Sequence, residues 1–430
     1  MGIWTATALV VGNIVGAAIF MLPASIAPFG WNALTAWILA LGGALCLAWV
    51  FARLAATFPD AGGAHAFMAM GVGDDLAFLG SWGYLVSIWA ACAALCITGV
   101  SYLTRLIPAL TLLPAGETLA GLAALALITW GNLRAMGGGV QLVSSVIKLL
   151  PFTAVIGLAG WTLLDRGLAA LPPIDAVPVT PAATLGAITI TFYGMLGLES
   201  AAIPADAVED AARTVPRATM IGTALSGLVT IIATCAVALM LPRELVVASK
   251  APTSDFIGGF FGGGASLFVS FCAVVSAFGC LNGWVLLAGE LPAAMAARGA
   301  LPRWFDARNA HGMPYRPLLL CAGITAVLLV LANSRAGIGA FNFVALISTA
   351  TSLLLYLFCV LGAVRFMRDG RLPHTPGLVL AAAGALAFAL LALYFSGSEA
   401  LAYGAGLVAL GWPLHRLAQR IGARAAARPA

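Results

Sequence analysis

Two glycine-interrupted stretches inside apolar segments contain the residues whose types and spacing can do chemistry. They are Gly12-Asn13-Ile14-Val15-Gly16-Ala17-Ala18-Ile19-Phe20 and Tyr193-Gly194-Met195-Leu196-Gly197-Leu198-Glu199-Ser200. Where a membrane helix unwinds, its backbone N–H and C=O groups lose their partners, and a ligand or water must satisfy them. A freed helix N-terminus suits a carboxylate and freed carbonyls suit an ammonium group, so the two stretches predict a site for an α-amino acid. The alternative is that the glycines only permit close helix packing.

Two charged residues fall within apolar segments. Lys148 lies in the run V-S-S-V-I-K-L-L-P, and Glu199 lies in the second glycine-interrupted stretch. An ionisable group at such depth costs at least about 2.5–3.5 kcal/mol and usually faces a cavity or a partner. For Lys148 the alternative is that its side chain reaches back to the interface. Glu199 either bridges helices or responds to pH, because burial disfavours its charged form.

The composition predicts the elements that must position these residues. Of 430 residues, 62% are hydrophobic and 9% are charged, against about 25% charged in a soluble domain. The mean hydropathy is +1.03. These values exclude a soluble enzyme and a disordered chain. The formal charge of +5 does not suggest nucleic-acid binding, because the basic residues are scattered among short loops. The eight cysteines lie in apolar stretches without metal-ligand spacing, so no metal site, disulfide framework or cofactor is expected.

The apolar runs predict an all-α polytopic membrane protein with about twelve transmembrane helices, since one crossing takes about 20 residues. They lie at about 3–28, 31–55, 79–104, 118–134, 139–164, 181–203, 217–241, 258–289, 315–333, 338–364, 376–396 and 398–414. The glycine-interrupted stretches fall in the first span of each group of five. This predicts two inverted repeats with broken helices 1 and 6 and a binding site near the midplane. The expected units are 1–166, 181–366, the last two helices in 374–417, and a basic tail at 418–430.

The basic residues predict the orientation. An even number of spans places both termini on one side, whose loops and tail contain fifteen arginines against five basic residues on the other. Positive-inside logic therefore places both termini in the cytoplasm and the protein in the inner membrane. No cleavable signal is expected, because the first apolar run has no basic n-region. This run starts almost at Met1, which leaves open a short cytoplasmic leader before it.

At these motifs the sequence resembles the amino acid–polyamine–organocation transporter superfamily. The run from Gly12 to Phe20 is similar to that family's helix 1 signature. Gly197-Leu198-Glu199-Ser200-Ala201 with Val215-Pro216-Arg217-Ala218-Thr219 resembles its helix 6 and the following loop. Ala296-Ala297-Arg298-Gly299-Ala300-Leu301-Pro302 resembles its helix 8–9 loop. Within the superfamily, the stretch from Phe271 to Gly289 is particularly similar to bacterial arginine/agmatine antiporters. This likeness implies alternating access around a fixed site.

The resemblance implies roles for single residues. Trp284 matches an aromatic that covers the substrate side chain, although a core or lipid-belt tryptophan is the alternative. Ser348 matches a polar contact, or it bonds only to a carbonyl one turn back. The residues expected to line the substrate site are Asn13, Ile14, Gly16, Ala17, Ala18, Ser87, Cys92, Tyr193, Leu196, Trp284 and Ser348. The residues expected to gate it are Tyr84, Glu199, Trp284 and Tyr356, and those expected to couple transport are Lys148 and Glu199.

Three departures from those antiporters bear on substrate and mechanism. Ala17 replaces a serine that binds the substrate carboxylate, which leaves backbone groups to bind it. Cys92 replaces an asparagine that helps to hold a guanidinium. Lys148 is similar to the helix 5 lysine of proton-coupled and exchanger-type permeases, where it would lie against unwound helix 1 in the place that a sodium ion takes in related transporters. Tyr193 stands where those antiporters have tryptophan, which is a milder change.

The sequence therefore predicts a secondary transporter, with an antiporter of cationic amino acids and polyamines as the first choice. A permease or exchanger for small neutral amino acids, proton-coupled through Lys148, is the main alternative. An intramembrane enzyme is not expected, because neither H-E-x-x-H nor G-x-S-x-G occurs. The absence of a P-loop argues against ATP drive. A channel or a receptor remains a separate class. The expected partners are a small amino acid or polyamine, the lipid bilayer and a second copy in a homodimer, with no nucleic acid.

Overall fold

The computed structural model describes residues 2–16, 18–58, 63–136, 147, 149–198, 211–335 and 338–426. In its first half the α-helices are α1 (Ile3–Ile14), α2 (Ala18–Ile26), α3 (Trp31–Thr57), α4 (Ala64–Val72), α5 (Asp74–Leu106), α6 (Gly116–Leu133), α8 (Leu149–Arg166) and α9 (Pro181–Tyr193). In its second half they are α10 (Ala211–Met240), α11 (Arg243–Ala248), α12 (Pro252–Phe261), α13 (Gly263–Ala297), α14 (Tyr315–Ala332), α15 (Gly339–Arg368), α16 (Pro376–Tyr394), α17 (Ser398–Ala409) and α18 (Gly411–Ala426). Short 3₁₀ turns join several of them, and the β-type pairing among the described residues is one bridge between Arg308 and Pro314.

The molecule is all-helical and crosses the membrane several times. Seven described helices are long and apolar enough to span it, namely α3, α5, α10, α13, α14, α15 and α16. The other predicted spans contain shorter or interrupted helices where the structure describes them. The run at 3–28, for example, contains α1 and α2, and the run at 398–414 contains α17 and the start of α18. The prediction of an all-α polytopic membrane protein is thus confirmed.

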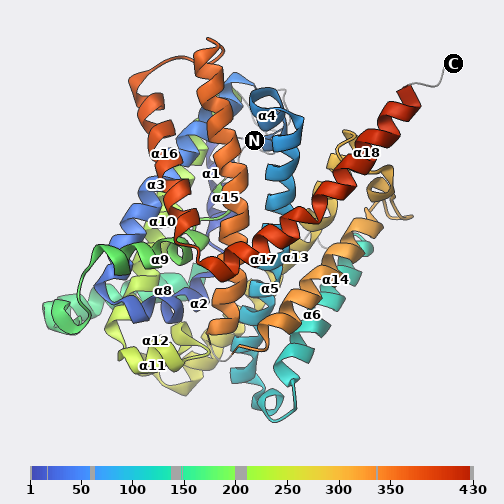
Figure 1. Cartoon of the computed structure of the whole chain (residues 1–430). Coiled ribbons are helices and arrows are strands. Elements are labelled where there is room, and N and C mark those ends of the chain that lie inside the picture. Colours follow the sequence, from blue (N-terminus) through green and yellow to red (C-terminus); the bar gives the residue numbers. More distant parts are fainter. Residues whose placement is uncertain are drawn as a thin grey trace.

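Helix α5 lies at the centre of the bundle. Of its most apolar 18-residue window, 94% is buried within the protein, against 33% for α16. It packs against α13, α14 and α15, and also against α4 and α6 (Figure 1). Both faces of α5 are apolar or carry small hydroxyls, as expected for a helix that touches protein rather than lipid on all sides. A side chain near the middle of α5 is therefore shielded from lipid.

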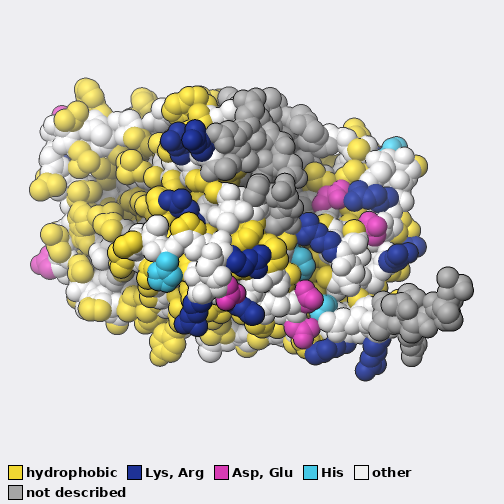
Figure 2. All heavy atoms as spheres, turned by 90° about the horizontal axis from the view of Figure 1, so that it is seen from above, with side chains coloured by type: hydrophobic (Ala, Val, Ile, Leu, Met, Phe, Trp, Pro, Cys, Tyr) yellow, Lys and Arg dark blue, Asp and Glu magenta, His cyan; other side chains and the backbone are white. Residues whose placement is uncertain are grey.

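Ion pairs gather at the two ends of the bundle. At one end, Glu290 of α13 pairs with Arg308 at 3.0 Å, and Asp75 of α5 pairs with Arg416 at 3.7 Å. We call this the basic end, and Figure 2 shows Lys and Arg side chains spread across it. At the opposite end the pairs are Arg105 with Asp255, Lys250 with Glu117, and Arg335 with Glu399. Residues assigned to one side of the membrane from the sequence thus lie at one end of the molecule.

The last two helices, α17 and α18, both pack against α5, and α17 also packs against α15. Residues 418–426 continue α18 as a helix, and α17 and α18 run obliquely across the bundle (Figure 1). The Trp82 indole donates to the Leu407 carbonyl at 3.1 Å, and the His415 ring stacks on Phe78 with centroids 4.1 Å apart. These contacts dock the C-terminal helix onto α5.

Candidate functional site

The first glycine-interrupted stretch breaks the helix. Helix α1 ends at Ile14, and Val15 has φ −72° and ψ 71°. The Gly16 N–H bonds to the Ile14 carbonyl at 2.7 Å, two residues back. These values describe an inverse γ-turn, which stops the i→i−4 ladder. Helix α2 then starts at Ala18. Backbone polar groups around the break therefore lack regular helical partners inside an apolar bundle.

The second stretch unwinds in a different way. After α9 ends at Tyr193, the N–H groups of Gly194, Met195 and Leu196 bond three residues back, at 3.1, 2.8 and 3.3 Å. Gly197 follows with φ +105°, a conformation that favours glycine. Tyr193 and Leu196 are both buried. The chain thus leaves the α-helix through 3₁₀-type turns and a left-handed glycine, at the position predicted from the glycines.

Gly194 lets this unwound segment approach its neighbours. A Cβ atom there would lie 2.7 Å from Trp37 and 2.8 Å from Leu22. We expect Gly194→Ala to destabilise the protein by about 1–3 kcal/mol through overpacking. The matched control is Gly186→Ala in the preceding helix α9, where the nearest atom, of Phe29, is 3.6 Å away. Thermal unfolding in detergent should show a lower Tm for Gly194→Ala only, and equal Tm values for the two variants would contradict this packing argument.

Ser87 and Ser348 meet where α5 crosses α15. The Ser348 hydroxyl donates to the Ser87 carbonyl at 3.0 Å, and the two hydroxyl oxygens are 3.2 Å apart. Both side chains are buried. Cys92 is also buried on α5, and it lies near Tyr193 together with Cys280 of α13. The structure therefore brings together Ser87, Ser348, Cys92 and Tyr193 from three different regions of the sequence.

A cavity of about 240 Å³ opens toward these residues from the basic end. Its lining includes Ser81 and Tyr84 of α5, Leu287 of α13 and Leu355 of α15. Residues three or seven positions apart lie on one helix face. Ser87 therefore lies on the face of α5 that carries Tyr84, one turn further into the bundle. In the same way Trp284 lies one turn deeper than Leu287 on α13, and Ser348 lies two turns deeper than Leu355 on α15.

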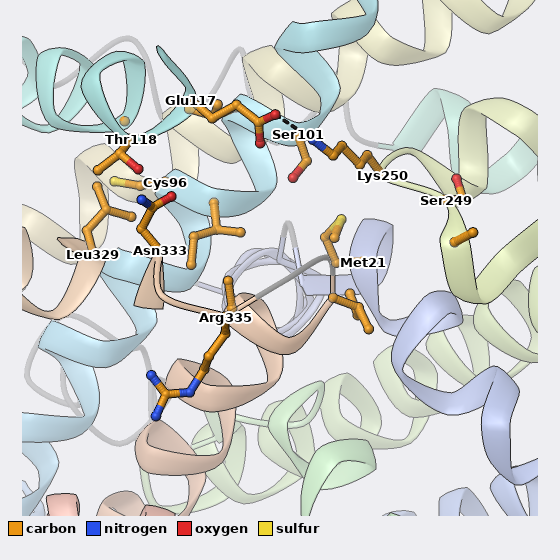
Figure 3. Close-up of a pocket in the computed structure, with 16 residues that line it drawn as sticks. Met21, Cys96, Ser101, Glu117, Thr118, Ser249, Lys250, Leu329, Asn333 and Arg335 are labelled. Carbon is orange, nitrogen blue, oxygen red and sulfur yellow. Dashed lines mark hydrogen bonds and ion pairs between the residues drawn. The ribbon is translucent and has the colours of Figure 1, made fainter. Parts of the chain in front are cut away.

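A second cavity of about 140 Å³ approaches from the opposite end. Cys96 and Ser101 of α5, Met21 of α2 and Arg335 contribute to its lining, and the Glu117–Lys250 ion pair lies at its edge (Figure 3). Along α5 the two cavities touch Tyr84 and Cys96, about 18 Å apart at 1.5 Å per residue. Residues 85–95 between them are all buried. A closed layer thus separates two openings, as a site reached alternately from each side requires.

The expected gate residues occupy different environments. Tyr84 lines the cavity at the basic end and is largely buried. Tyr356 is fully buried and packs edge-on against Phe51 and Phe192, with ring centroids 5.8 and 6.0 Å away. Trp284 is partly buried against the core. The aromatic gate residues therefore do not form one stacked cluster but surround the closed layer from separate helices.

Some of the expected residues cannot be placed. Ala17, Lys148 and Glu199 lie outside the described residues, and only the backbone of Asn13 and Ala18 is described. Among the residues that are described, no group of three or more His, Cys, Asp or Glu side chains could hold a metal ion.

Two buried polar links were not predicted from the sequence. The Asn132 amide of α6 donates to the side chain of Asn282 in α13 at 3.0 Å, two residues before Trp284. The Tyr102 hydroxyl donates to the Phe20 carbonyl of α2 at 2.8 Å and accepts from the Thr253 N–H at 3.2 Å. The second link fixes the half-helix after the first break against α5 and α12. The sequence shows a polar residue in each of these apolar runs, but it does not show which group that side chain bonds to.

His65 lies on the wall of the cavity at the basic end. Its Nδ1 is 2.8 Å from the Ser81 hydroxyl, and burial, with the Arg298 guanidinium, lowers the pKa of His65 below 6.5. The folded protein therefore binds this proton less readily than the unfolded chain, and stability is lost as pH falls below the unfolded value. We expect acidification from pH 8 to pH 5 to lower Tm more in wild type than in His65→Gln. Parallel Tm curves for the two proteins would contradict this expectation.

Comparison with known proteins gives concordant results. The profile described as amino acid permease matches residues 1–401. A cadaverine/lysine antiporter of Escherichia coli K12 is 31% identical over 376 residues, which cover 85% of this chain and 83% of the relative. The putrescine transporter PotE of the same organism is 26% identical, with 97% of this chain and 95% of the relative covered. Its Haemophilus influenzae namesake is 25% identical, with 96% of each chain covered.

Proposed function

The chain belongs to the amino acid permease family, and we propose that this member exchanges cationic amino acids for the amines left by their decarboxylation. A multi-pass membrane transporter of amino acids or polyamines is thus the established class, and the protein is not an enzyme. The observation that carries the proposal is the closed layer at Ser87, Cys92 and Ser348 between two cavities. A carrier that never opens both sides at once needs such a layer, whereas a channel needs a continuous pore.

Within this class we assign the finer architecture. Twelve spans would form inverted repeats at 1–166 and 181–366, followed by helices 11 and 12 at 374–417 and the basic segment 418–430. The interruptions at Val15–Gly16 and after Tyr193 support the assignment, since each falls in the first span of its repeat. The basic end would face the cytoplasm and contain both termini, in the inner membrane, as the bias of basic residues indicates.

The substrate class follows from the relatives and from the site. The relatives transport lysine and cadaverine, or putrescine, so basic amino acids and diamines fit better than arginine and agmatine alone. In our proposal the first break binds the substrate carboxylate through backbone N–H groups, because Ala17 offers no hydroxyl. Trp284 covers the cationic side chain, and Tyr84, Tyr356 and Glu199 gate the site. An amine that lacks the carboxylate would use the same cation contacts, which is what exchange requires.

Counterflow in proteoliposomes tests this proposal. Vesicles loaded with cadaverine, putrescine, agmatine, alanine or nothing would be given labelled lysine outside. We expect rapid lysine uptake only with an internal cationic substrate, and competition by external cadaverine. The rival reading, a proton-coupled permease for small neutral amino acids, predicts uptake into empty vesicles under a pH gradient and competition by alanine. That pattern would overturn exchange of cationic substrates while leaving the family intact.

A further inference from the structure

An apolar groove runs along the outside of the bundle between α6 and α14, which lie side by side (Figure 1). Its volume is about 500 Å³, within the range of small-molecule sites. The lining consists of leucine and alanine, such as Leu122, Ala126 and Leu319, with Trp130 and Thr129. The Thr129 hydroxyl donates to the Leu125 carbonyl at 2.7 Å, so the groove offers no free hydroxyl donor there. The groove therefore suits a hydrocarbon chain.

The dimensions of the groove match one leaflet of a bilayer. On α6 it runs from Leu122 to Leu133, about 16 Å at 1.5 Å per residue. This is about half of the roughly 30 Å hydrocarbon core. Because α6 ends at the basic end, the groove covers the half of the membrane next to that end. An acyl chain of the lipids in that leaflet thus has the right length.

Two arginines flank the mouth of the groove. Arg134 follows Leu133, and its guanidinium lies 5.1 Å from the centre of the Trp130 ring. Arg316 stands one turn before Leu319, with its guanidinium 5.4 Å from the Trp304 ring. The Asn309 amide donates to the Leu133 carbonyl at 2.8 Å, which holds the α13–α14 connection against the end of α6.

Among the described residues these two arginines contact aromatic rings rather than a carboxylate, and the Arg316 Nε–H donates to the Tyr315 hydroxyl at 3.0 Å. Arg308, on the same connection, instead pairs with Glu290 at 3.0 Å. The mouth therefore presents two uncompensated positive charges beside exposed tryptophan rings, at the level where tryptophan favours lipid headgroups. Anionic headgroups bind to such basic sites between membrane helices.

We propose that this groove binds one anionic phospholipid, with an acyl chain between α6 and α14 and the phosphate at Arg134 and Arg316. The two positive charges favour an anionic lipid in the groove over a second copy of the protein, since an apolar helix of that copy would leave both arginines unpaired. The proposal is independent of the transported substrate. It concerns a lipid site on the face away from the closed layer around Ser87 and Ser348.

Native mass spectrometry of the detergent-purified protein tests the site, with phosphatidylglycerol and phosphatidylcholine titrated separately. We expect wild type to bind one phosphatidylglycerol tightly, and Arg134→Gln/Arg316→Gln to bind it about 30-fold more weakly. Two basic residues near an anionic headgroup are each worth about 1 kcal/mol, and 1.4 kcal/mol is tenfold in affinity. Ala126→Phe, which fills the exposed groove but keeps both charges, should weaken binding as well.

A matched control separates this site from general attraction to anionic lipid. Arg53 lies 5.0 Å from the Trp49 ring and Arg371 lies 4.8 Å from the Phe366 ring, away from the groove. Arg53→Gln/Arg371→Gln removes the same charge, and we expect it to keep wild-type affinity. Equal losses in the two double variants, or unchanged binding in Arg134→Gln/Arg316→Gln, would overturn the proposal. A dimer that Ala126→Phe dissociates would instead assign the groove to a second copy.

Discussion

Trp284→Ala is expected to raise the KM for lysine by about 2- to 30-fold and to leave the folded protein intact. The reason is the loss of a cation–π contact worth about 0.5–2 kcal/mol with the substrate ammonium. Trp284 stands one turn deeper than Leu287 on the face of α13 that lines the cavity, and it is only partly buried. We propose that the substrate meets its ring there. Trp284→Phe should recover part of the affinity, because a smaller aromatic face remains.

Initial rates of lysine uptake into cadaverine-loaded proteoliposomes provide the measurement. The control is Trp161→Ala on α8, a residue that is 68% exposed. An unchanged KM in both Trp284 variants would mean that Trp284 packs in the core and does not contact the substrate. A loss of transport with unchanged KM would instead place Trp284 in the conformational step rather than in binding.

The helix breaks could be predicted from the sequence because their cause is local. Glycines at positions 12, 16, 194 and 197 interrupt runs that are otherwise apolar, and α1 and α9 end within those stretches. Helix ends were harder to predict. The run at 79–104 is part of a helix that starts at Asp74, since acidic residues in a first turn favour the positive end of the helix dipole. Those two aspartates looked like loop residues in the sequence.

The long-range polar links could not be predicted, because nothing local marks the partner. Asn132 and Asn282 are 150 residues apart, and Tyr102 bonds to a carbonyl 82 residues away. Any asparagine in an apolar run has the same local pattern whether it meets another amide or a backbone carbonyl. The pairing depends on how α5, α6, α12 and α13 pack, which hydropathy does not encode.

Lys148→Ala is expected to reduce transport by about 30-fold or more and to flatten its pH dependence. From the likeness to permeases with a helix 5 lysine, we predict that the Lys148 ammonium donates to backbone carbonyls beside the break after Ile14. A buried carbonyl left without a donor costs about 1–3 kcal/mol, so two of them cost enough for such a loss. Lys148→Arg keeps a charge but not the compact ammonium, and should recover little.

The pH profile separates coupling from packing. If Lys148 gains and loses a proton in each cycle, removing it should abolish the response of the uptake rate to an imposed pH gradient, whatever rate remains. A purely structural lysine would lower the rate at every pH by one factor and keep the shape of the profile.

The control is Arg166→Ala, which removes a positive charge from the exposed end of the following helix α8. Helix α1 ends in an inverse γ-turn at Val15, and we predict that a donor meets carbonyls released at this break. Lys148 is the only lysine within a predicted span. Wild-type rate and wild-type pH profile in Lys148→Ala would exclude this role and leave water or the substrate itself as that donor.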